Sequence, residues 1–352
     1  MSYNVAINGF GRIGRLFLRN CLLDKNKKEI KVKAINDLAK TKTISHLFKY
    51  DSMYGTYPGK VKALENDEKE YDSLLIDDDY KEIKIFNEEK PENLPWDNLN
   101  IDLVLEATGK FRDREGAKAH LKAGAKRVLI SAPAKDEDVT IVMGVNEEEF
   151  DPFSDFIISN SSCTTNAISP LLKVINEEFG VVSSYMTTIH SYTNDQRLLD
   201  LTHEDLRRAR AAAESIIPTT TGAAKAVSKV LPLLKGKVEG FAIRVPTPTV
   251  SMIDLTCFVR KETDREEVNR ILEERAEGFE GILDINYTPL VSSDYKGSEA
   301  SCIVDGLLTD VSGENLIKVC GWYDNEWAYS KRLLDLTSYI NKKTGKLMST
   351  WK

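Results

Sequence analysis

The chain has 352 residues, 41% of them hydrophobic, which is enough for two domains that each bury a core of their own. Its formal net charge of -7 gives no overall positive field that would attract nucleic acid or an anionic membrane, so an anionic substrate needs local positive groups. The five cysteines form no C-x-x-C pair, and no apolar run approaches the ~20 residues of a membrane span. These features predict a cytoplasmic protein with reduced thiols and no metal site.

Strands and helices are expected to alternate in the first half of the chain. Short β-favouring segments occur at residues 3–7, 30–35, 83–86, 103–106 and 127–130. Helical spacing of apolar residues follows Gly14, and residues 114–123 form a second helical segment before Gly124. This alternation predicts an α/β domain with a parallel sheet and helices on its faces.

The first strand runs into a glycine-rich turn. Gly9, Gly11 and Gly14 form the pattern G-x-G-x-x-G, which gives a tight turn, room for a pyrophosphate and close packing of helix on strand. Asp37 ends the next strand, where a carboxylate can bind a ribose diol and repel a 2′-phosphate, so the pattern predicts NAD. The alternatives are an ordinary glycine-rich turn and, for Asp37, a turn or cap residue.

An acidic stretch at residues 64–80 has no apolar period and is predicted to be a solvated hairpin or loop without a function.

The second half of the chain has a different pattern. Beyond residue 160, β-rich runs at 181–189, 241–245 and 250–260 predict a second domain with a largely antiparallel sheet. Residues 331–341 read as a final amphipathic helix.

Cys163 is the candidate nucleophile. It precedes a helical segment at residues 167–179 that is closed by Gly180, so it is expected in or near the first turn of a helix. The free N–H groups and the positive end of the helix dipole there favour thiolate over thiol. Pro170 is able to kink this helix, but downstream of Cys163. The alternative is a small buried cysteine, which the polar neighbours of Cys163 disfavour.

A base for Cys163 is expected among the four histidines. His190 ends the β-patterned run and precedes a polar loop, which is a suitable platform for a base that reaches a cleft. His203 is an almost equal candidate by spacing alone, and an ordinary surface histidine is the alternative for either residue.

Two groups of residues are candidates for binding anions. The threonines at 219–221 and Gly222 precede a helical segment, where a threonine cap and free amides suit an anion. Arg244 and an arginine cluster (Arg207, Arg208, Arg210) provide guanidinium groups that match phosphate geometry. The alternative is that these arginines pair with nearby carboxylates such as Asp205.

Seven sequence blocks resemble those of the NAD-dependent phosphorylating glyceraldehyde-3-phosphate dehydrogenases of bacterial type. They are NGFGRIGR at 8–15, AIND at 34–37, EATG at 106–109, SCTTN at 162–166, TGAAKAV at 221–227, RVPTPTVS at 244–251 and WYDNEW at 322–327. The resemblance covers nearly the whole chain. It implies a Rossmann NAD-binding domain of residues 1–162, completed by a C-terminal helix at 328–352. It also implies an α+β catalytic and oligomerisation domain of residues 163–327 and a homotetramer.

The resemblance also implies roles for individual residues. Cys163 would be the nucleophile and His190 its base. NAD would be contacted by Gly9, Gly11, Arg12, Ile13, Gly14, Asp37, Lys90, Ser131 and Asn325. The substrate phosphate and inorganic phosphate would be held by Ser162, Thr164, Thr193, Thr221, Gly222, Arg244 and one arginine of the pair Arg208 and Arg210. The segment of residues 192–218 resembles the S-loop of the family, which borders the cofactor of the neighbouring subunit.

The implied reaction is the oxidative phosphorylation of D-glyceraldehyde 3-phosphate to 1,3-bisphosphoglycerate, in glycolysis or gluconeogenesis. It would reduce NAD and pass through a hemithioacetal and a thioester on Cys163. An erythrose-4-phosphate dehydrogenase is the alternative within the same enzyme class. A dinucleotide-binding regulator without catalysis is the alternative outside it, although such a protein has no reason to keep Cys163, His190 and the anion-binding groups together.

Two departures from the family pattern stand out. Thr202 replaces a proline that is usual in bacterial relatives that use NAD, which leaves additional use of NADP open, although Asp37 and Leu201 favour NAD. The acidic insert at 65–79 and the basic tail at 342–352 are longer than usual, and neither carries an interpretable motif.

Overall fold

A computed structural model describes residues 2–66, 71–77 and 81–350, with side chains omitted for residue 81 and residues 346–350. The chain divides into two compact units. The first unit comprises residues 1–141, 147–161 and 330–352, and the second comprises residues 142–146 and 162–329. Within the described residues, no helix has the length and apolar character needed to span a membrane.

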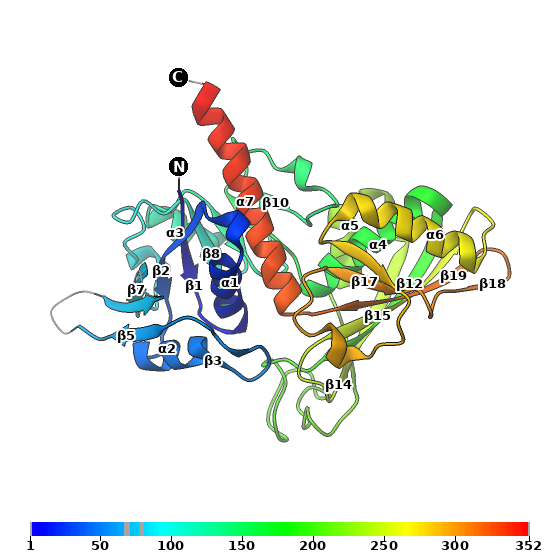
Figure 1. Cartoon of the computed structure of the whole chain (residues 1–352), viewed down its shortest axis with the longest axis horizontal. Coiled ribbons are helices and arrows are strands. Elements are labelled where there is room, and N and C mark those ends of the chain that lie inside the picture. Colours follow the sequence, from blue (N-terminus) through cyan, green and yellow to red (C-terminus); the bar gives the residue numbers. More distant parts are fainter. Residues whose placement is uncertain (1, 67–70, 78–80, 351–352) are drawn as a thin grey trace. The chain divides into compact units, whose positions relative to one another are not determined.

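The first unit is built on a nine-stranded sheet (Figure 1). Its strand order is β10-β11-β9-β8-β1-β2-β7-β6-β5, and β3 and β4 form a separate pair. The strands are β1 (Tyr3–Asn8), β2 (Ile30–Asn36), β3 (Tyr50–Asp51), β4 (Gly55–Thr56), β5 (Val61–Leu64), β6 (Asp72–Ile76), β7 (Lys81–Phe86), β8 (Leu103–Glu106), β9 (Val128–Ile130), β10 (Val139–Thr140) and β11 (Ile157–Ser159). The helices are α1 (Arg12–Leu23), α2 (Thr41–Lys49) and α3 (Arg114–Lys122), with 3-10 turns at Lys25–Lys27, Pro91–Asn93 and Glu147–Glu149.

The central strand β1 explains why this sheet forms. Val5, Ala6 and Ile7 are all fully buried, as expected for a strand with helices on both faces of the sheet. β1 pairs in parallel with β2 and β8. The pairs β2–β7, β8–β9, β9–β11 and β10–β11 are also parallel. The predicted parallel α/β fold is confirmed, with strand ends within two residues of those expected.

The acidic stretch is partly different from the prediction. β5 and β6 form an antiparallel hairpin, as predicted, and β6 then pairs antiparallel with β7. Leu74 and Ile76 of β6 are fully buried, so this part of the segment is not a solvated loop. The alternation of a single five-residue strand was too short to stand out among the acidic residues. Residues 67–70 and 78–80 of the acidic insert lie outside the described residues.

The second unit contains an eight-stranded sheet with the order β13-β14-β12-β15-β19-β17-β16, and β18 pairs with β19. The strands are β12 (Val181–Ser191), β13 (Ile217–Thr219), β14 (Val238–Val245), β15 (Ser251–Val259), β16 (Leu283–Asn286), β17 (Cys302–Asp305), β18 (Asp310–Ser312) and β19 (Leu316–Tyr323). The helices are α4 (Cys163–Phe179), α5 (Ala223–Val230) and α6 (Arg265–Ala276), with 3-10 turns at Pro232–Leu234, Glu277–Phe279 and Ser292–Tyr295. The pairs are antiparallel except β12–β14 and β16–β17, which confirms the largely antiparallel sheet.

Helix α4 is anchored in the core of the second unit. Ile168, Leu171 and Ile175 are fully buried and belong to one apolar cluster with Leu255 of β15 and Val319 of β19. The helix continues through Pro170, whose ring nitrogen removes only the one hydrogen bond that would reach the carbonyl of residue 166. The buried face of α4 therefore fixes the position of its first residue, Cys163.

Two segments extend the boundaries expected from the sequence. Residues 142–146 belong to the second unit, because Val142 and Val145 pack on Val230 and the Lys173 ammonium donates to the Val145 carbonyl. The final helix, α7 (Trp327–Thr350), is longer than the predicted 331–341, and its part within the first unit is held by a 2.7 Å ion pair between Lys331 and Asp24.

Candidate active site

Cys163 is the first residue of α4. Ser162 is the N-cap, and its Oγ accepts a hydrogen bond of 3.1 Å from the Thr165 amide. Ser161, just before the cap, has a positive φ of 56°, a conformation that non-glycine residues adopt rarely and mostly where the surrounding structure demands it. The prediction that Cys163 lies in the first turn is confirmed, and the cap and the bend before it fix the direction in which the helix starts.

The Sγ atom of Cys163 lies 3.5 Å from Nε2 of His190. His190 is on β12, where its ring is buried and packs edge-on against the Tyr323 ring at 6.0 Å. His203 instead lies in the loop after β12, with its Nε2 3.6 Å from Asp195. The geometry therefore separates two histidines that spacing alone left almost equal.

Two neighbours compete for the other ring nitrogen of His190. The Ser191 carbonyl lies 2.7 Å from Nδ1. In the tautomer with a proton on Nδ1, this carbonyl accepts that proton and Nε2 is left to accept a proton from the thiol. The Nη1 of Arg244 lies 2.6 Å from the same Nδ1 and donates to the Ser191 carbonyl at 2.9 Å. Because a guanidinium only donates, its contact with Nδ1 belongs to the other tautomer, in which Nδ1 is the acceptor. His190 and Arg244 are directly paired across β12 and β14, which explains this proximity.

Burial opposes each charge of the pair when it is taken alone. It raises the pKa of the Cys163 thiol, although the Arg244 cation and the Thr164 hydrogen bond act in the opposite direction. Burial and the Arg244 cation lower the pKa of His190 to about 3. The raised pKa runs against the expectation that the helix terminus favours the thiolate, because desolvation acts in the opposite direction. A proton that moves from Sγ to Nε2 creates both charges together, and at this distance they stabilise each other.

Contacts distinguish Cys163 from the other cysteines. Burial raises the pKa of all four others, to about 12 for Cys257 and Cys302 and to about 11 for Cys320. Cys21, like Cys163, is only partly buried, and burial is again the first cause of its raised pKa. Of the two partly buried thiols, Cys163 is the one with an imidazole at hydrogen-bonding distance.

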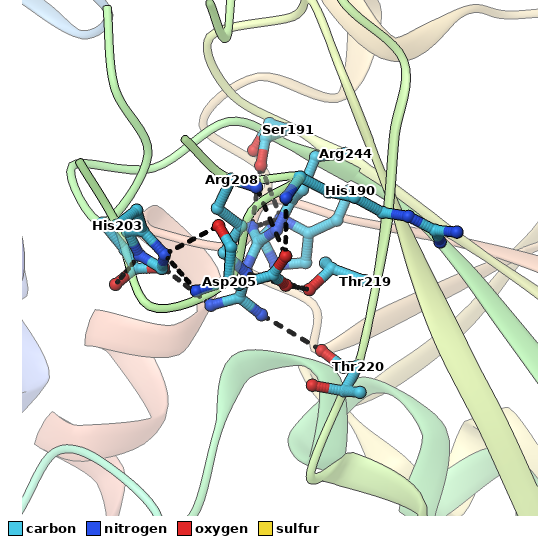
Figure 2. A network of polar contacts seen from close by, with 10 residues as sticks. His190, Ser191, His203, Asp205, Arg208, Thr219, Thr220 and Arg244 are labelled. Atoms are coloured by element: carbon cyan, nitrogen blue, oxygen red, sulfur yellow. Dashed lines mark hydrogen bonds and ion pairs between the residues drawn. The ribbon is translucent and has the colours of Figure 1, made fainter. Parts of the chain in front are cut away.

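Arg208 and Arg244 lie in a network of polar contacts near His190 (Figure 2). Arg208 donates from Nε to Thr219 Oγ1 at 2.9 Å and from Nη2 to the Thr220 carbonyl at 3.1 Å, and it pairs with Asp195 at 2.6 Å. Arg210 pairs with Asp200, and both of these side chains are exposed. The structure thus places Arg208, rather than Arg210, beside the threonines that precede α5. It also shows the pairing with carboxylates that the sequence left open.

The N-terminus of α5 differs from the expected threonine cap. Gly222 is the N-cap residue, and the Thr221 Oγ1 accepts a 3.2 Å hydrogen bond from the Ala223 amide. Thr193 lies in the loop after β12, and its carbonyl accepts from the Gln196 amide. Thr164 Oγ1 is held by the Tyr323 hydroxyl at 2.9 Å.

Some residues that organise this site were missed by the sequence reasoning. The Tyr323 hydroxyl joins Thr164 and Thr188, with 2.9 Å to each threonine oxygen. Thr188 and His190 are two residues apart on β12, so they project from the same face of the sheet. The alternation of side chains along the strand could have indicated that Thr188 faces the same side as His190. The contact with Tyr323 could not be predicted in this way, because Tyr323 is 135 residues away in the sequence.

Asn325 lies just after Asp324, which caps the start of α7 with hydrogen bonds to the Glu326 and Trp327 amides. The Asn325 side chain is buried, and its Oδ1 accepts hydrogen bonds from Ser191 Oγ at 2.9 Å and Ser251 Oγ at 3.1 Å. A residue that the resemblance assigns to the cofactor is thus linked directly to the residue that follows His190.

The glycine-rich turn of the first unit has the geometry that a dinucleotide requires. Gly9 has φ +92°, and a Cβ there would lie 2.6 Å from the Thr108 amide nitrogen. A Cβ on Gly14 would overlap the Gly9 carbonyl, whereas one on Gly11 would meet nothing within 4 Å. The first and third glycines are therefore required by packing. The second leaves open space at the N-terminus of α1, as a bound pyrophosphate needs.

Asp37 has two roles in this region. Its Oδ2 accepts a 2.7 Å hydrogen bond from the Phe10 amide and its Oδ1 accepts one of 2.9 Å from the Ala39 amide, so it also organises the turn. It lines a pocket of about 290 Å³ together with Gly9, Gly11, Glu88 and Thr108. The carboxylates of this pocket disfavour a 2′-phosphate, which fits NAD.

The other residues assigned to the cofactor by resemblance lie at different places in the first unit. Arg12 pairs with Asp51 at 2.5 Å, and Ile13 is in the first turn of α1. Ser131 follows β9 and donates from Oγ to the Glu106 carbonyl at 3.0 Å. Lys90 is exposed and precedes a 3-10 turn. Within the described residues, no group of His, Cys, Asp and Glu side chains is arranged to hold a metal ion.

Comparisons with known proteins agree with this geometry. Residues 3–114 match the model of the NAD binding domain of glyceraldehyde 3-phosphate dehydrogenase, and residues 162–325 match the model of its C-terminal domain. The chain is 54% identical to glyceraldehyde-3-phosphate dehydrogenase of Geobacillus stearothermophilus over 344 residues, which cover 97% of this chain and 99% of that protein.

Similar values are found for relatives of other origin. Glyceraldehyde-3-phosphate dehydrogenase 2 of Nostoc sp. is 54% identical over 340 residues, 96% of this chain and 98% of that protein. The chloroplastic glyceraldehyde-3-phosphate dehydrogenase A of Chlamydomonas reinhardtii is 53% identical over 341 residues, 96% of this chain and 89% of that protein. The chain therefore belongs to the glyceraldehyde-3-phosphate dehydrogenase family of NAD-dependent oxidoreductases.

Proposed function

We propose that the protein oxidises D-glyceraldehyde 3-phosphate and, with inorganic phosphate, converts it to 1,3-bisphosphoglycerate. The observation that carries this proposal is the 3.5 Å contact between Cys163 Sγ and His190 Nε2, at the N-terminus of a helix and beside Arg244. A thiol paired with an imidazole is the arrangement that covalent catalysis on an aldehyde carbon requires.

The first step uses the neutral imidazole as a base. His190 Nε2 accepts the thiol proton, and the Sγ lone pair forms a bond to the aldehyde carbon. The carbonyl oxygen takes a proton from His190 and becomes the hydroxyl of a hemithioacetal. The Ser191 carbonyl supports this direction of transfer, because it lies 2.7 Å from Nδ1 and stabilises the tautomer with a proton on Nδ1, in which Nε2 is the acceptor.

His190 acts again when the hemithioacetal is oxidised. NAD, when bound, supplies the acceptor for the hydride that leaves the former aldehyde carbon. His190 Nε2 takes the hydroxyl proton as the carbon–oxygen double bond forms, and a thioester remains on Cys163. A phosphate oxygen then attacks the thioester carbon, the carbon–sulfur bond breaks, and Cys163 leaves as the thiolate while the acyl phosphate is released. The thiolate takes the proton from His190 Nε2, which restores the thiol and the neutral imidazole. Arg244, which lowers the pKa of the thiol, stabilises that leaving group.

The phosphate groups would be held by the side chains around Arg208 and Arg244. Arg244 uses Nη1 for His190 and Ser191, whereas its buried Nε has no hydrogen-bond partner among the described residues. A buried guanidinium N–H without a partner favours an anion. Ser162, Thr164, Thr193, Thr221 and Gly222 are the further candidates for the two phosphates.

We also propose that the chain forms a homotetramer in the cytoplasm. The segment of residues 192–218 exposes large apolar side chains to an unusual degree, with Leu206 82%, Leu198 79% and Ile216 70% exposed. Apolar groups clustered in this way favour burial against another subunit. The five free cysteines fit a reducing compartment.

Replacing His190 by asparagine is expected to shift the pH dependence of Cys163 alkylation to higher pH. Without the imidazole, burial still opposes the thiolate, the thiol proton loses its acceptor, and only the Arg244 cation remains to stabilise the negative charge. The rate of modification by iodoacetamide at neutral pH should fall about tenfold or more. Mass spectrometry of the modified peptide assigns the rate to Cys163. The control is His203→Asn, and a profile that moves equally in both variants would contradict the assignment.

Replacing Cys163 by alanine is expected to abolish turnover and the stoichiometric burst of NADH, while NAD binding persists. The matched control is Cys21→Ala, which removes another partly buried thiol and should keep the burst. Stopped-flow absorbance measures the burst, and calorimetry measures NAD binding. Substantial activity in the Cys163 variant would refute the covalent mechanism. Comparing kcat/KM for glyceraldehyde 3-phosphate and erythrose 4-phosphate, with and without phosphate, tests the identity of the substrate.

Replacing Arg208 by glutamine is expected to lower kcat/KM for the phosphorylated aldehyde by about 10- to 100-fold, the range for a lost hydrogen bond to a charged group. Arg210→Gln is the control, because it removes an equal charge from an exposed pair two residues away. Steady-state kinetics compare the two variants. A larger loss in the Arg210 variant would reassign the phosphate site.

Sedimentation equilibrium is expected to give a mass about four times that of the chain. Leu206→Asp should shift the distribution to smaller species, because it places a charge in the proposed interface. Leu233→Asp is the matched control, since Leu233 is 79% exposed but lies outside the loop. A monomeric wild-type protein would refute the tetramer.

A further inference from the structure

A buried carboxylate and a buried histidine contact the residues that line the nucleotide pocket of the first unit. Glu106 ends β8 and His120 is in α3, and their side chains are 1% and 0% exposed. His120 Nε2 lies 3.1 Å from Glu106 Oε2. The mechanism proposed above uses neither residue.

Residues that line this pocket converge on the pair. Asn8 at the end of β1 donates from Nδ2 to Glu106 Oε2 at 2.6 Å, and Asn36 at the end of β2 donates from Nδ2 to Asn8 Oδ1 at 2.7 Å. Thr108, which follows β8, donates to Glu106 Oε1 from its amide at 2.8 Å and from its hydroxyl. The carboxylate therefore joins the carboxyl ends of three neighbouring parallel strands, β2, β1 and β8.

The same pair holds the loop after β8. The Phe111 ring, which also lines the pocket, packs edge-on against the His120 ring with 6.3 Å between the centroids. The Thr108 hydroxyl accepts from the Lys110 amide at 3.0 Å. A Cβ on Gly9 would lie 2.6 Å from the Thr108 amide nitrogen, so the position of this amide also determines where the glycine-rich turn lies.

The indole of Trp96 determines which nitrogen of His120 carries the proton. Trp96 Nε1 lies 3.1 Å from His120 Nδ1, and because an indole nitrogen only donates, Nδ1 is the acceptor. In the neutral ring the proton is then on Nε2, where it is donated to Glu106 Oε2. The histidine thus presents a fixed donor to the carboxylate.

The amides on the other side of Glu106 are oriented in the same way. The Glu88 amide donates to Asn36 Oδ1 at 2.9 Å, so Asn36 Nδ2 faces Asn8 Oδ1. Asn8 Nδ2 consequently faces Glu106. Both chains of hydrogen bonds begin at donors that cannot be reversed, an indole and a backbone amide, and both end at this carboxylate. A buried carboxylate is costly to leave partly bonded, so the network resists rearrangement.

We propose that Glu106, held by His120, is a positioning residue that keeps the nucleotide pocket in the shape that NAD binds. Its carboxylate fixes Asn8 and Thr108, the two residues that determine the position of Gly9. The glycine-rich turn is therefore formed before the cofactor arrives, and binding is stronger because the ligand does not have to order it. This inference depends on the NAD-binding domain and its pocket, and not on the reaction proposed for the second unit.

Glu106→Gln is expected to weaken the binding of NAD and of ADP-ribose by the same factor, about tenfold, as measured by calorimetry. Glutamine keeps the size of the side chain, but it has one acceptor oxygen and one amide donor, so part of the network loses its acceptor. ADP-ribose shares the adenosine and pyrophosphate groups with NAD and lacks the nicotinamide, so the ratio of the two affinities should not change.

Asp102→Asn is the matched control, because Asp102 lies just before the first residue of β8, at the opposite end of the strand from Glu106. Its carboxylate accepts from the Asn4 amide of β1 at 2.8 Å and from Lys126 Nζ at 2.6 Å. This variant should leave both affinities unchanged. An unchanged affinity in folded Glu106→Gln, an equal loss in the two variants, or a loss for NAD alone would each overturn the proposal.

Two variants of His120 keep the proposal testable if Glu106→Gln does not fold. His120→Gln provides an amide oxygen for the Trp96 indole and an amide N–H for Glu106, as the ring does, whereas His120→Leu provides neither. The glutamine variant should bind ADP-ribose within about twofold of the wild-type affinity, and the leucine variant about tenfold more weakly. Equal affinities in the two variants would contradict the positioning role, since the hydrogen bonds would then make no difference.

Hydrogen exchange, followed by mass spectrometry, examines the pocket without a ligand. The amides of residues 107–111 are expected to exchange faster in Glu106→Gln than in the wild-type protein or in Asp102→Asn, because the Thr108 amide loses a charged acceptor. Exchange that is unchanged in Glu106→Gln would show that the carboxylate does not hold this loop, and the proposal would fall.

Discussion

The chemistry proposed for this protein depends on one contact, between the sulfur of Cys163 and the Nε2 of His190. The packing of the second unit fixes the positions of both residues. Cys163 starts a helix whose apolar face packs into the core of the second unit, and His190 is on β12, an interior strand of the sheet in that unit. The apolar packing that stabilises this unit therefore also sets the distance between thiol and imidazole, so that little reorganisation is needed when the proton moves.

The charges around this pair work against burial. Desolvation raises the pKa of Cys163 and lowers that of His190, which by itself would leave a neutral and unreactive pair. Arg244 opposes the first effect and reinforces the second, so it favours a thiolate beside a neutral imidazole. A bound phosphate would neutralise part of this guanidinium charge and thereby change the balance at both residues. In the proposed mechanism, substrate binding and proton transfer would therefore be linked through Arg244.

Local patterns in the sequence were sufficient for much of the fold and for the position of the candidate nucleophile in the first turn of its helix. The G-x-G-x-x-G turn, the β1–α1–β2 order and the helix after Cys163 follow from spacing and from the demands of glycine, so they could be predicted. The direction of the thiol pKa shift could not, because it depends on burial by residues distant in sequence. The choice between Arg208 and Arg210 likewise depends on a 2.9 Å contact with Thr219 that no local pattern specifies. Leu74 and Ile76 were hidden in an acidic stretch for the same reason, since their burial comes from the strands beside them.

Ser191 shows why such sites resist prediction from residue types. Its carbonyl bonds to the His190 ring, its amide to Ser251 and its hydroxyl to Asn325, so all of its polar groups are used in the interior. A serine at the end of a β-rich run carries no signal of its own, because its partners are 60 and 134 residues away. Its importance arises only from the pairing of β12 with the strands on either side. A substitution of Ser191 that keeps the strand propensity would leave the β pattern of the sequence unchanged. It would nonetheless disturb the contacts with both the His190 ring and the Asn325 side chain.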